Sequence, residues 1–191
     1  MRVTDNWDFA PNSREQIVHD LLLAHSQCFR LLARIEDAAF FRPLGTGWSP
    51  AQNVVHLTRS VRPVANALGF PKLLLGLLFG RSKTSSASYA ALRHRYQGIL
   101  AAGGGAGRFT PRAVPLPTNP AEARGRMVAV LADAIEELGR RVATWSEIDL
   151  DRYRLPHPLL GKLTVREMLF FTIQHLAHHA SKVEERLATS R

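Results

Sequence analysis

The chain has 191 residues, of which 46% are hydrophobic and 21% charged, a balance typical of a globular protein and not of a disordered one. Its longest strongly apolar run, Leu73 to Phe79, is much shorter than the roughly 20 residues that span a bilayer. Near the N-terminus, acidic residues stand where a secretory signal would have its apolar stretch. The single cysteine, Cys28, excludes an intrachain disulfide. We therefore expect one cytoplasmic domain with no membrane partner.

The charge of the chain is strongly basic, with 25 Lys and Arg against 16 Asp and Glu and a formal net charge of +9. Such a charge raises the question of nucleic-acid binding. The arginines are scattered, however, and the sequence has no block of like charges and no basic stripe interleaved with aromatic residues. We interpret the charge as a solvated arginine-rich surface and expect no nucleic-acid partner, unless the arginines converge on one face.

Four segments begin with the same pattern, a capping side chain followed three residues later by Gln or Glu. In this arrangement each side chain can satisfy a backbone amide that the first turn of a helix leaves without a partner. The pattern therefore predicts four helix starts. The pairs are Asn12 with Glu15, Ser49 with Gln52, Asn119 with Glu122, and Thr164 with Glu167.

Apolar residues recur at three- and four-residue spacing after each of these starts, whereas no segment alternates convincingly with period two. This periodicity predicts an all-α protein. Four amphipathic helices of this length favour a four-helix bundle. The predicted helices cover residues 13–40, 50–68, 120–146 and 164–188.

Residues 69–118 form a long connection between the second and third predicted helices. It contains the apolar stretch LLLGLLFG, a weakly helical patch from Tyr89 to Leu100, a glycine run and a proline-rich stretch. A structureless loop of this length is unusual inside a compact domain, so we expect a short extra helix there. The leucines of residues 73–78 are expected to pack over one end of the bundle or against a second subunit, which would give a homodimer.

The sharpest group of histidines is His175-Leu-Ala-His178-His179 in the last predicted helix. Residues four apart share a helix face, so His175 and His179 can present both imidazoles to one point. On a helical wheel, His179 points toward the apolar arc and His175 lies at its margin. His178 falls on the other side, facing solvent or a neighbouring element.

In the second predicted helix, His56 lies at the edge of the apolar stripe, with Asn53 and Ser60 on its inner side. Three neutral imidazoles on two rigid helices would bind Zn, Ni or Fe and leave positions open for water or substrate. Two histidines four residues apart on a helix are also common by chance. Spacing alone therefore leaves open the alternative that these are ordinary structural histidines.

Two segments resemble the DinB-like superfamily of bacterial metal-binding four-helix bundles. The segment GWSPAQNVVHL, residues 47–57, is similar to the start of that family's second helix, with its tryptophan, Ser-Pro start and later histidine. Residues 157–187 contain a His-Pro turn, a Gly-x-Leu-Thr-x-x-Glu helix start and a closing His-x-x-x-His, which resemble the other half of the signature. The resemblance implies a single DinB-like domain over residues 1–191, with metal ligands His56, His175 and His179.

The resemblance also implies the activity of a metal-dependent transferase or of a related isomerase. The transferase would join a low-molecular-weight thiol, such as bacillithiol or mycothiol, to a small electrophile. A divalent metal ion would bind the thiol sulfur and lower its pKa. Two alternatives stay open, a metal-dependent hydrolase and a non-enzymatic metal-binding or stress-related interaction module. No Glu or Asp lies one turn from His175 or His179 on the inward face, which favours thiol transfer over hydrolysis.

Other residues near these motifs have structural interpretations that we favour. Trp48 precedes a helix cap and is expected to staple the entering chain, with lining of a pocket as the alternative. His157 is interpreted as a turn residue, with a gate over the metal as the alternative. His25 is expected to be a satisfied core histidine unless it lies close to His56, Cys28 to be buried and inert, and Arg59 to lie on the surface.

Overall fold

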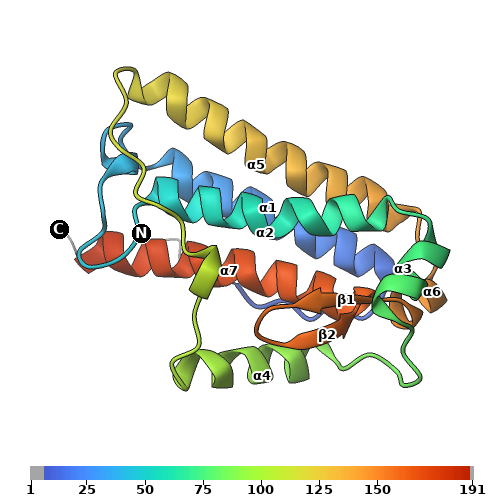
Figure 1. Ribbon diagram of the computed structural model, residues 1–191. Coiled ribbons are helices and arrows are strands. Elements are labelled where there is room, and N and C mark those ends of the chain that lie inside the picture. Colours follow the sequence, from blue (N-terminus) through green and yellow to red (C-terminus); the bar gives the residue numbers. More distant parts are fainter. Residues whose placement is uncertain (1–6, 190–191) are drawn as a thin grey trace.

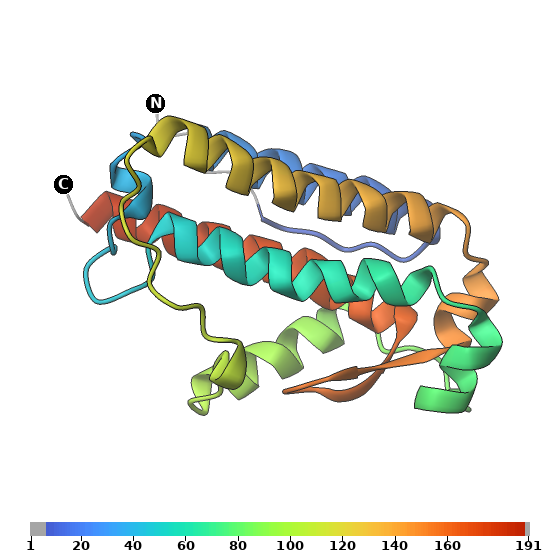
Figure 2. The same ribbon diagram turned by 45° about the horizontal axis from the view of Figure 1, so that its top comes forward.

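The computed structural model describes residues 7–189, and its longest elements are four helices that pack side by side (Figures 1 and 2). The first and second of them each contact the third and the fourth, so the four enclose one core. Fully buried apolar side chains from each, such as Leu21, Leu57 and Leu138, fill this core. The predicted four-helix bundle is confirmed. Its helices are α1 (Arg14–Ala33), α2 (Pro50–Leu68), α5 (Pro120–Ala143) and α7 (Val165–Thr189).

Shorter elements surround one side and one end of the bundle. Figures 1 and 2 place α4 and a β-hairpin on the α7 side, away from α5, with α3 and α6 at one end. The hairpin precedes α7 in the chain, and α3 and α4 both belong to the connection between α2 and α5. The elements are α3 (Lys72–Phe79), α4 (Tyr89–Ala101), α6 (Glu147–Arg152), β1 (Arg154–His157), β2 (Gly161–Thr164) and the 3₁₀ turns η1 (Ala39–Phe41) and η2 (Gly107–Phe109).

The predicted helix caps are present at α2, α5 and α7. At α2, the Ser49 hydroxyl accepts a hydrogen bond from the amide of Gln52, whose side chain accepts one from the amide of Ser49. Thr164 and Glu167 exchange the same pair of bonds at α7. The prediction for α1 is wrong by one residue. Ser13 caps that helix, because its hydroxyl accepts a hydrogen bond from the amide of Gln16.

Helix α1 ends at Ala33, earlier than the predicted end near residue 40. The guanidinium of Arg124, from α5, donates hydrogen bonds of 2.8 Å to the carbonyl oxygens of Leu32 and Ile35. The carbonyl of Leu32 also accepts from the amide of Ile35, and the carboxylate of Glu36 accepts from the amides of Ala38 and Ala39, so the chain leaves the helix in a turn. The apolar spacing continues to Ile35, past the last helical residue, so the periodicity of α1 did not reveal its end.

One two-stranded hairpin, which the sequence did not predict, lies beside the helices of this mostly helical protein. Strands β1 and β2 pair antiparallel, with Leu155 opposite Leu163 and both side chains buried. Pro156 and Pro158 disfavour a helix here, and Gly161 adopts a φ of +74° at the start of the second strand. Each strand has only four residues, too few to produce a clear period-two pattern.

The connection of residues 69–118 holds two helices, α3 and α4, where one was expected. Helix α4 packs on α7 through edge-on contacts between aromatic rings, Tyr89 with Phe170 and Tyr96 with Phe171. No single described helix has both the length and the apolar character of a membrane span. Helices α2 and α3 have the required length and apolar character only when they are taken together, and the chain bends by 117° between them.

The cap of α2 leads to a test of stability. Replacing Ser49 by Ala removes the hydroxyl that accepts from Gln52, and we expect the free energy of unfolding to fall by about 1 kcal/mol. Urea unfolding followed by circular dichroism measures this loss. The matched control is Ser85→Ala, at an exposed position of the long connection, which is expected to stay within about 0.5 kcal/mol of the wild type. Equal losses in the two variants would contradict the capping role.

Candidate metal centre

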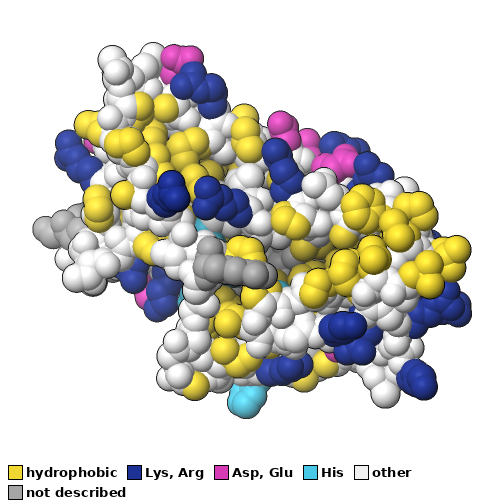
Figure 3. Space-filling view, in the orientation of Figure 1, with side chains coloured by type: hydrophobic (Ala, Val, Ile, Leu, Met, Phe, Trp, Pro, Cys, Tyr) yellow, Lys and Arg dark blue, Asp and Glu magenta, His cyan; other side chains and the backbone are white. Residues whose placement is uncertain are grey.

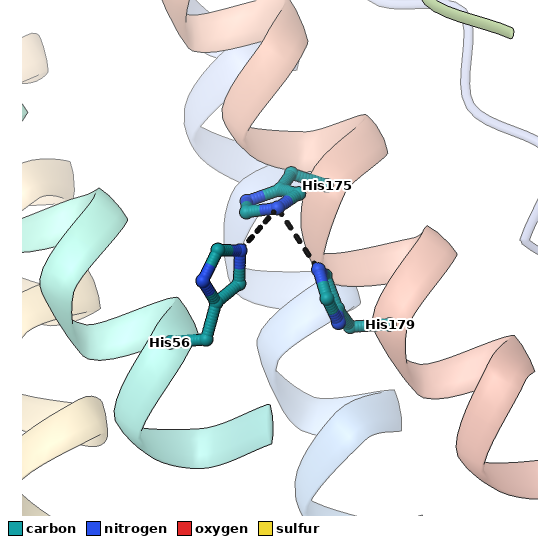
Figure 4. Close-up of side chains that lie close together, drawn as sticks. All are labelled: His56, His175 and His179. Carbon is teal, nitrogen blue, oxygen red and sulfur yellow. Dashed lines mark hydrogen bonds between the residues drawn. The ribbon is translucent and has the colours of Figure 1, made fainter. Parts of the chain in front are cut away.

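The three histidines singled out in the sequence converge in the structure (Figure 4). His56 comes from α2, and His175 and His179 come from successive turns of α7. The Nε2 atom of His175 lies 3.1 Å from Nε2 of His56 and 3.0 Å from Nε2 of His179. All three side chains are buried. The structure therefore brings one nitrogen of each ring to a single point between the two helices.

The second nitrogen of each ring has a hydrogen-bond partner on the protein. Nδ1 of His56 lies 3.1 Å from the backbone carbonyl of Phe109, which can only accept. Nδ1 of His179 lies 2.7 Å from Oδ1 of Asn53, whose amide nitrogen donates to the carbonyl of Ser49 and so fixes the orientation of the group. Both rings therefore carry their hydrogen on Nδ1.

The partner of His175 leads to the same assignment. Nδ1 of His175 lies 3.3 Å from the hydroxyl oxygen of Ser60. That hydroxyl donates its own hydrogen to the carbonyl of Leu57 at 2.8 Å, so its oxygen accepts from the imidazole. Asn53 and Ser60 lie on the same face of α2 as His56, about one turn before and after it. One helix thus supplies a ring and orients the two rings of its neighbour.

With every Nδ1 carrying the hydrogen, the three Nε2 lone pairs point toward one another. Lone pairs in this arrangement repel unless a cation lies between them. Two nitrogens bound to one zinc ion at tetrahedral angles would lie about 3.4 Å apart, close to the spacing seen here. A hydrogen bond to the second nitrogen of each ring is also the usual support of a metal-bound histidine. The residues present therefore fit a divalent metal ion.

The electrostatics keep these rings neutral. Burial lowers the pKa of His56, and it lowers the pKa of His175 and of His179 well below the ordinary value. The neighbouring imidazoles act in the same direction on the pKa of His175, because two protonated rings at this distance would repel each other. No proton therefore competes with a metal ion for the Nε2 atoms near neutral pH.

A cavity of about 410 Å³ opens beside the three histidines. Its wall is mostly apolar and combines residues from α2, α4, α7, the hairpin and the glycine-rich segment before η2. Among the described residues that line it, none has a carboxylate and only one is an Arg or Lys, Arg59. The wall contains Trp48, His56, Arg59, Ser60, Pro63, Val64, Tyr96, Leu100, Gly104, Gly105, Ala106, Phe109, Pro156, His157, Pro158, Leu159, Met168, Phe171, Thr172, His175, His178 and His179.

The structure shows that two residues with structural interpretations also line the cavity. Trp48 lies in the cavity wall, where its ring stacks on that of His179 at 5.7 Å between centroids, so the pocket-lining alternative holds. Arg59, expected on the surface, is exposed but also lines the cavity. His178 faces a neighbouring element as expected, with its ring 6.0 Å from that of Tyr96 in α4.

The interpretations of His157 and Cys28 hold, whereas that of His25 does not. His157 is a turn residue, because its Nδ1 accepts hydrogen bonds from the amides of Leu159 and Leu160, and its ring also lines the cavity. The expectation for His25 is wrong, because its ring is only half-buried, edge-on to Phe29 and apart from the cavity, and its Nε2 has no hydrogen-bond partner among the described residues. Burial raises the pKa of Cys28 to about 12, which keeps the thiol protonated and unreactive.

Two groups near the site had no signal that pointed to them in the sequence. The carbonyl of Phe109 orients His56 but belongs to the backbone of an irregular segment, where any residue could supply it. Tyr96 reaches the cavity because α4 folds back over α7, and burial raises the pKa of its hydroxyl to about 12. A neutral phenol therefore forms part of the wall.

Comparison with known proteins gives a family and a fold. The sequence profile of the DinB superfamily matches residues 21–182. Among solved structures, TT2238, described as "a four-helix bundle protein", has a TM-score of 0.56 and 18% identity over 91% of this chain and 99% of that one. YfiT from Bacillus subtilis, described as "a probable metal-dependent hydrolase with an unusual four-helix bundle topology", has a TM-score of 0.59 and 14% identity over 99% of this chain and 94% of that one. At sequence identities this low, the similarity to these two structures shows the fold of the chain and not its function.

A weaker likeness links the chain to the colibactin self-resistance protein ClbS, solved in complex with a double-stranded DNA. The TM-score is 0.47 and the identity 16%, over 92% of this chain and 95% of that one, too weak to carry an argument about partners. A search of curated proteins found no match.

His157 leads to a prediction about pH. Burial, assisted by the charge of Arg95, lowers the pKa of His157 to about 4, whereas an unfolded histidine titrates near 6.5. Between these values only the unfolded chain takes up the proton, so stability is lost as the pH falls through this window. For this one group the slope reaches up to about 1.4 kcal/mol per pH unit.

The variant His157→Asn removes this titration while its side-chain oxygen can still accept from the turn amides. We expect the free energy of unfolding of metal-free protein to fall less steeply between about pH 6.5 and 4.5 in this variant than in the wild type. Chemical unfolding at a series of pH values measures the slope. The exposed His94→Asn serves as control and is expected to match the wild type. An unchanged slope in His157→Asn would show that its titration does not contribute.

Proposed function

This chain belongs to the DinB superfamily, and on that premise we propose that His56, His175 and His179 bind one divalent metal ion, Zn, Ni or Fe, in an enzyme that acts on small molecules. The observation that carries the proposal is the convergence of three Nε2 atoms whose rings are all held by hydrogen bonds at Nδ1. We propose that the reaction transfers a low-molecular-weight thiol to a small electrophile.

A metal ion in this site would act as a Lewis acid that lowers the pKa of a thiol or a water in an open coordination position. The protein supplies the surroundings. Trp48, Phe171 and Met168 form an apolar part of the cavity wall. This surface would exclude bulk water and contact the apolar body of a substrate. Arg59 offers a positive charge in the same wall, which would attract an anionic thiol or electrophile.

The composition of the wall supports thiol transfer over hydrolysis. A thiol needs only to lose its proton to become a strong nucleophile, whereas hydrolytic sites commonly also use a carboxylate as general base. The described cavity residues include no carboxylate. Hydrolysis is the second candidate, because the description of YfiT names that activity and because His178 gives the wall a neutral imidazole able to accept a proton. A non-enzymatic metal-binding role is the remaining alternative.

Metal content tests the first step of this proposal. We expect the purified, untagged wild type to contain about one equivalent of Zn, Ni or Fe by elemental mass spectrometry, since three preoriented imidazoles suffice for such a site. The variant His56→Ala/His179→Ala is expected to contain none. The control His19→Ala/His94→Ala removes two exposed histidines instead and is expected to retain the metal. A folded wild type that neither contains nor binds these metals would refute the site.

The activity is tested on the metal-loaded protein. Bacillithiol, mycothiol and cysteine are each incubated with an alkyl halide, and the thioether product is measured by mass spectrometry beside the same variants. Thioether formed by the wild type and by the His19→Ala/His94→Ala control, but not by His56→Ala/His179→Ala, supports thiol transfer. Hydrolysis of an ester or amide panel without thiol consumption would support the hydrolase instead.

Asn53 is expected to set the affinity of the site without touching the metal. Replacing Asn53 by Ala removes the acceptor of the Nδ1 hydrogen of His179, and zinc affinity should fall by about 10- to 100-fold. Competition against a chromogenic chelator measures the change. The variant Asn53→Asp retains an oxygen acceptor at the same position and is expected to retain most of the affinity. If Asn53→Ala binds zinc as tightly as the wild type, the orienting role is wrong.

A further inference from the structure

Helix α3 presents a leucine-rich face to solvent. Four of its leucines, at positions 73, 74, 77 and 78, are exposed by 65%, 40%, 76% and 57%. At 100° per residue these positions fall within an arc of about 140°, and Leu75, which is fully buried, points to the opposite side. One face of α3 thus holds the helix to the protein, while the other is apolar and uncovered.

Two further apolar side chains extend this face. Phe70 precedes α3 and is 48% exposed, and Ile148 of α6 is 75% exposed. An ion pair of 2.7 Å between Lys72 and Asp149 holds α6 beside the start of α3. Figure 3 shows the resulting hydrophobic area at the right edge of the molecule. We call it the α3 patch, and it consists of Phe70, Leu73, Leu74, Leu77, Leu78 and Ile148.

A group of cations lies beside the C-terminal end of α3. Arg81 forms a β-bridge with Tyr153, and the amide of Ser82 donates to the carbonyl of Arg152, so the segment after α3 runs along residues 152–154. The ammonium of Lys162 donates to the carbonyl of Phe79, the last residue of α3. Dark blue groups beside the yellow area in Figure 3 show the same proximity. The basic rim consists of Arg81, Lys83, Arg152, Arg154 and Lys162.

The cations of the basic rim outnumber the acids near them, although the charge of Arg152 also acts on Asp149. None of its five cations forms an ion pair with an acid anywhere in residues 7–189. The acids of α6 have other partners, because Asp149 pairs with Lys72, and Glu147 and Asp151 pair with Arg166. An uncovered apolar face thus lies next to a net positive surface.

We propose that the α3 patch and its basic rim dock the protein onto the surface of an anionic lipid bilayer. Leucines that enter the boundary between headgroups and acyl chains, with cations beside them at the level of the headgroups, are typical of interfacial membrane binding. The sequence-based expectation of no membrane partner followed from the lack of a spanning segment, and docking at the interface requires none. A second copy on the same patch would carry the same positive rim and so would offer it no anionic partner, whereas anionic headgroups would.

Vesicle co-sedimentation of the full-length protein tests this proposal. We expect the wild type to sediment with phosphatidylglycerol-containing vesicles, to stay in solution with pure phosphatidylcholine, and to be released by high salt. The variant Leu77→Ser/Leu78→Ser is expected to lose at least about tenfold in partitioning, and Lys83→Gln/Arg152→Gln a similar amount. The control Leu22→Ser/Leu116→Ser changes two exposed leucines outside the patch and is expected to bind as the wild type does.

Light scattering and circular dichroism accompany the vesicle assay. All variants alter exposed side chains, so each is expected to give the spectrum and unfolding midpoint of the wild type. If the wild type binds neither kind of vesicle, the proposal is overturned. So would a stable dimer that dissociates when Leu77 and Leu78 are replaced, because a second copy would then cover the patch. Removal of the metal is expected to leave vesicle binding unchanged, which separates this inference from the proposed enzyme function.

Discussion

The packing of α2 beside α7 is the constraint on which the candidate metal centre depends. His175 and His179 lie one turn apart on α7, but a third imidazole reaches them only because α2 runs alongside. The same helix carries Asn53 and Ser60, which orient the two rings of α7. A shift of α2 along α7 would therefore displace the imidazole of His56. It would also break the hydrogen bonds that orient the rings of His175 and His179. This dependence explains why buried polar groups can be accommodated at the edge of an apolar core, since each has a partner.

The four long helices alone would leave this site open. The connection of residues 69–118 encloses it, because α4 covers α7 with Tyr96, and the segment before α5 supplies the carbonyl that holds His56. The β-hairpin adds His157 and its flanking prolines to the wall. The bundle thus positions the nitrogen donors and supplies part of the apolar wall, and the added segments complete the wall. The size and shape of the cavity therefore depend on both.

The sequence predicts the parts of the structure that depend on local spacing. The caps of α2 and α7 and the shared face of His175 and His179 are visible in short motifs, because helix geometry relates residues three and four apart. The family resemblance then adds His56, which no spacing connects to α7. The carbonyls at the end of α1 accept hydrogen bonds from Arg124 in another helix, and the ring of His56 is held by a backbone carbonyl. Neither interaction leaves a residue-type pattern, so neither could be predicted.

Nitrogen NMR of histidine-labelled protein loaded with one equivalent of zinc tests the central claim most directly, because it distinguishes the two nitrogens of each ring. The structure predicts that His56, His175 and His179 all retain their hydrogen on Nδ1 and that all three Nε2 resonances shift on zinc binding, while the resonances of His19 and His94 do not. Zinc binding that leaves the Nε2 resonances of these three rings in place, or that shifts their Nδ1 resonances as the bound nitrogens, would contradict the account.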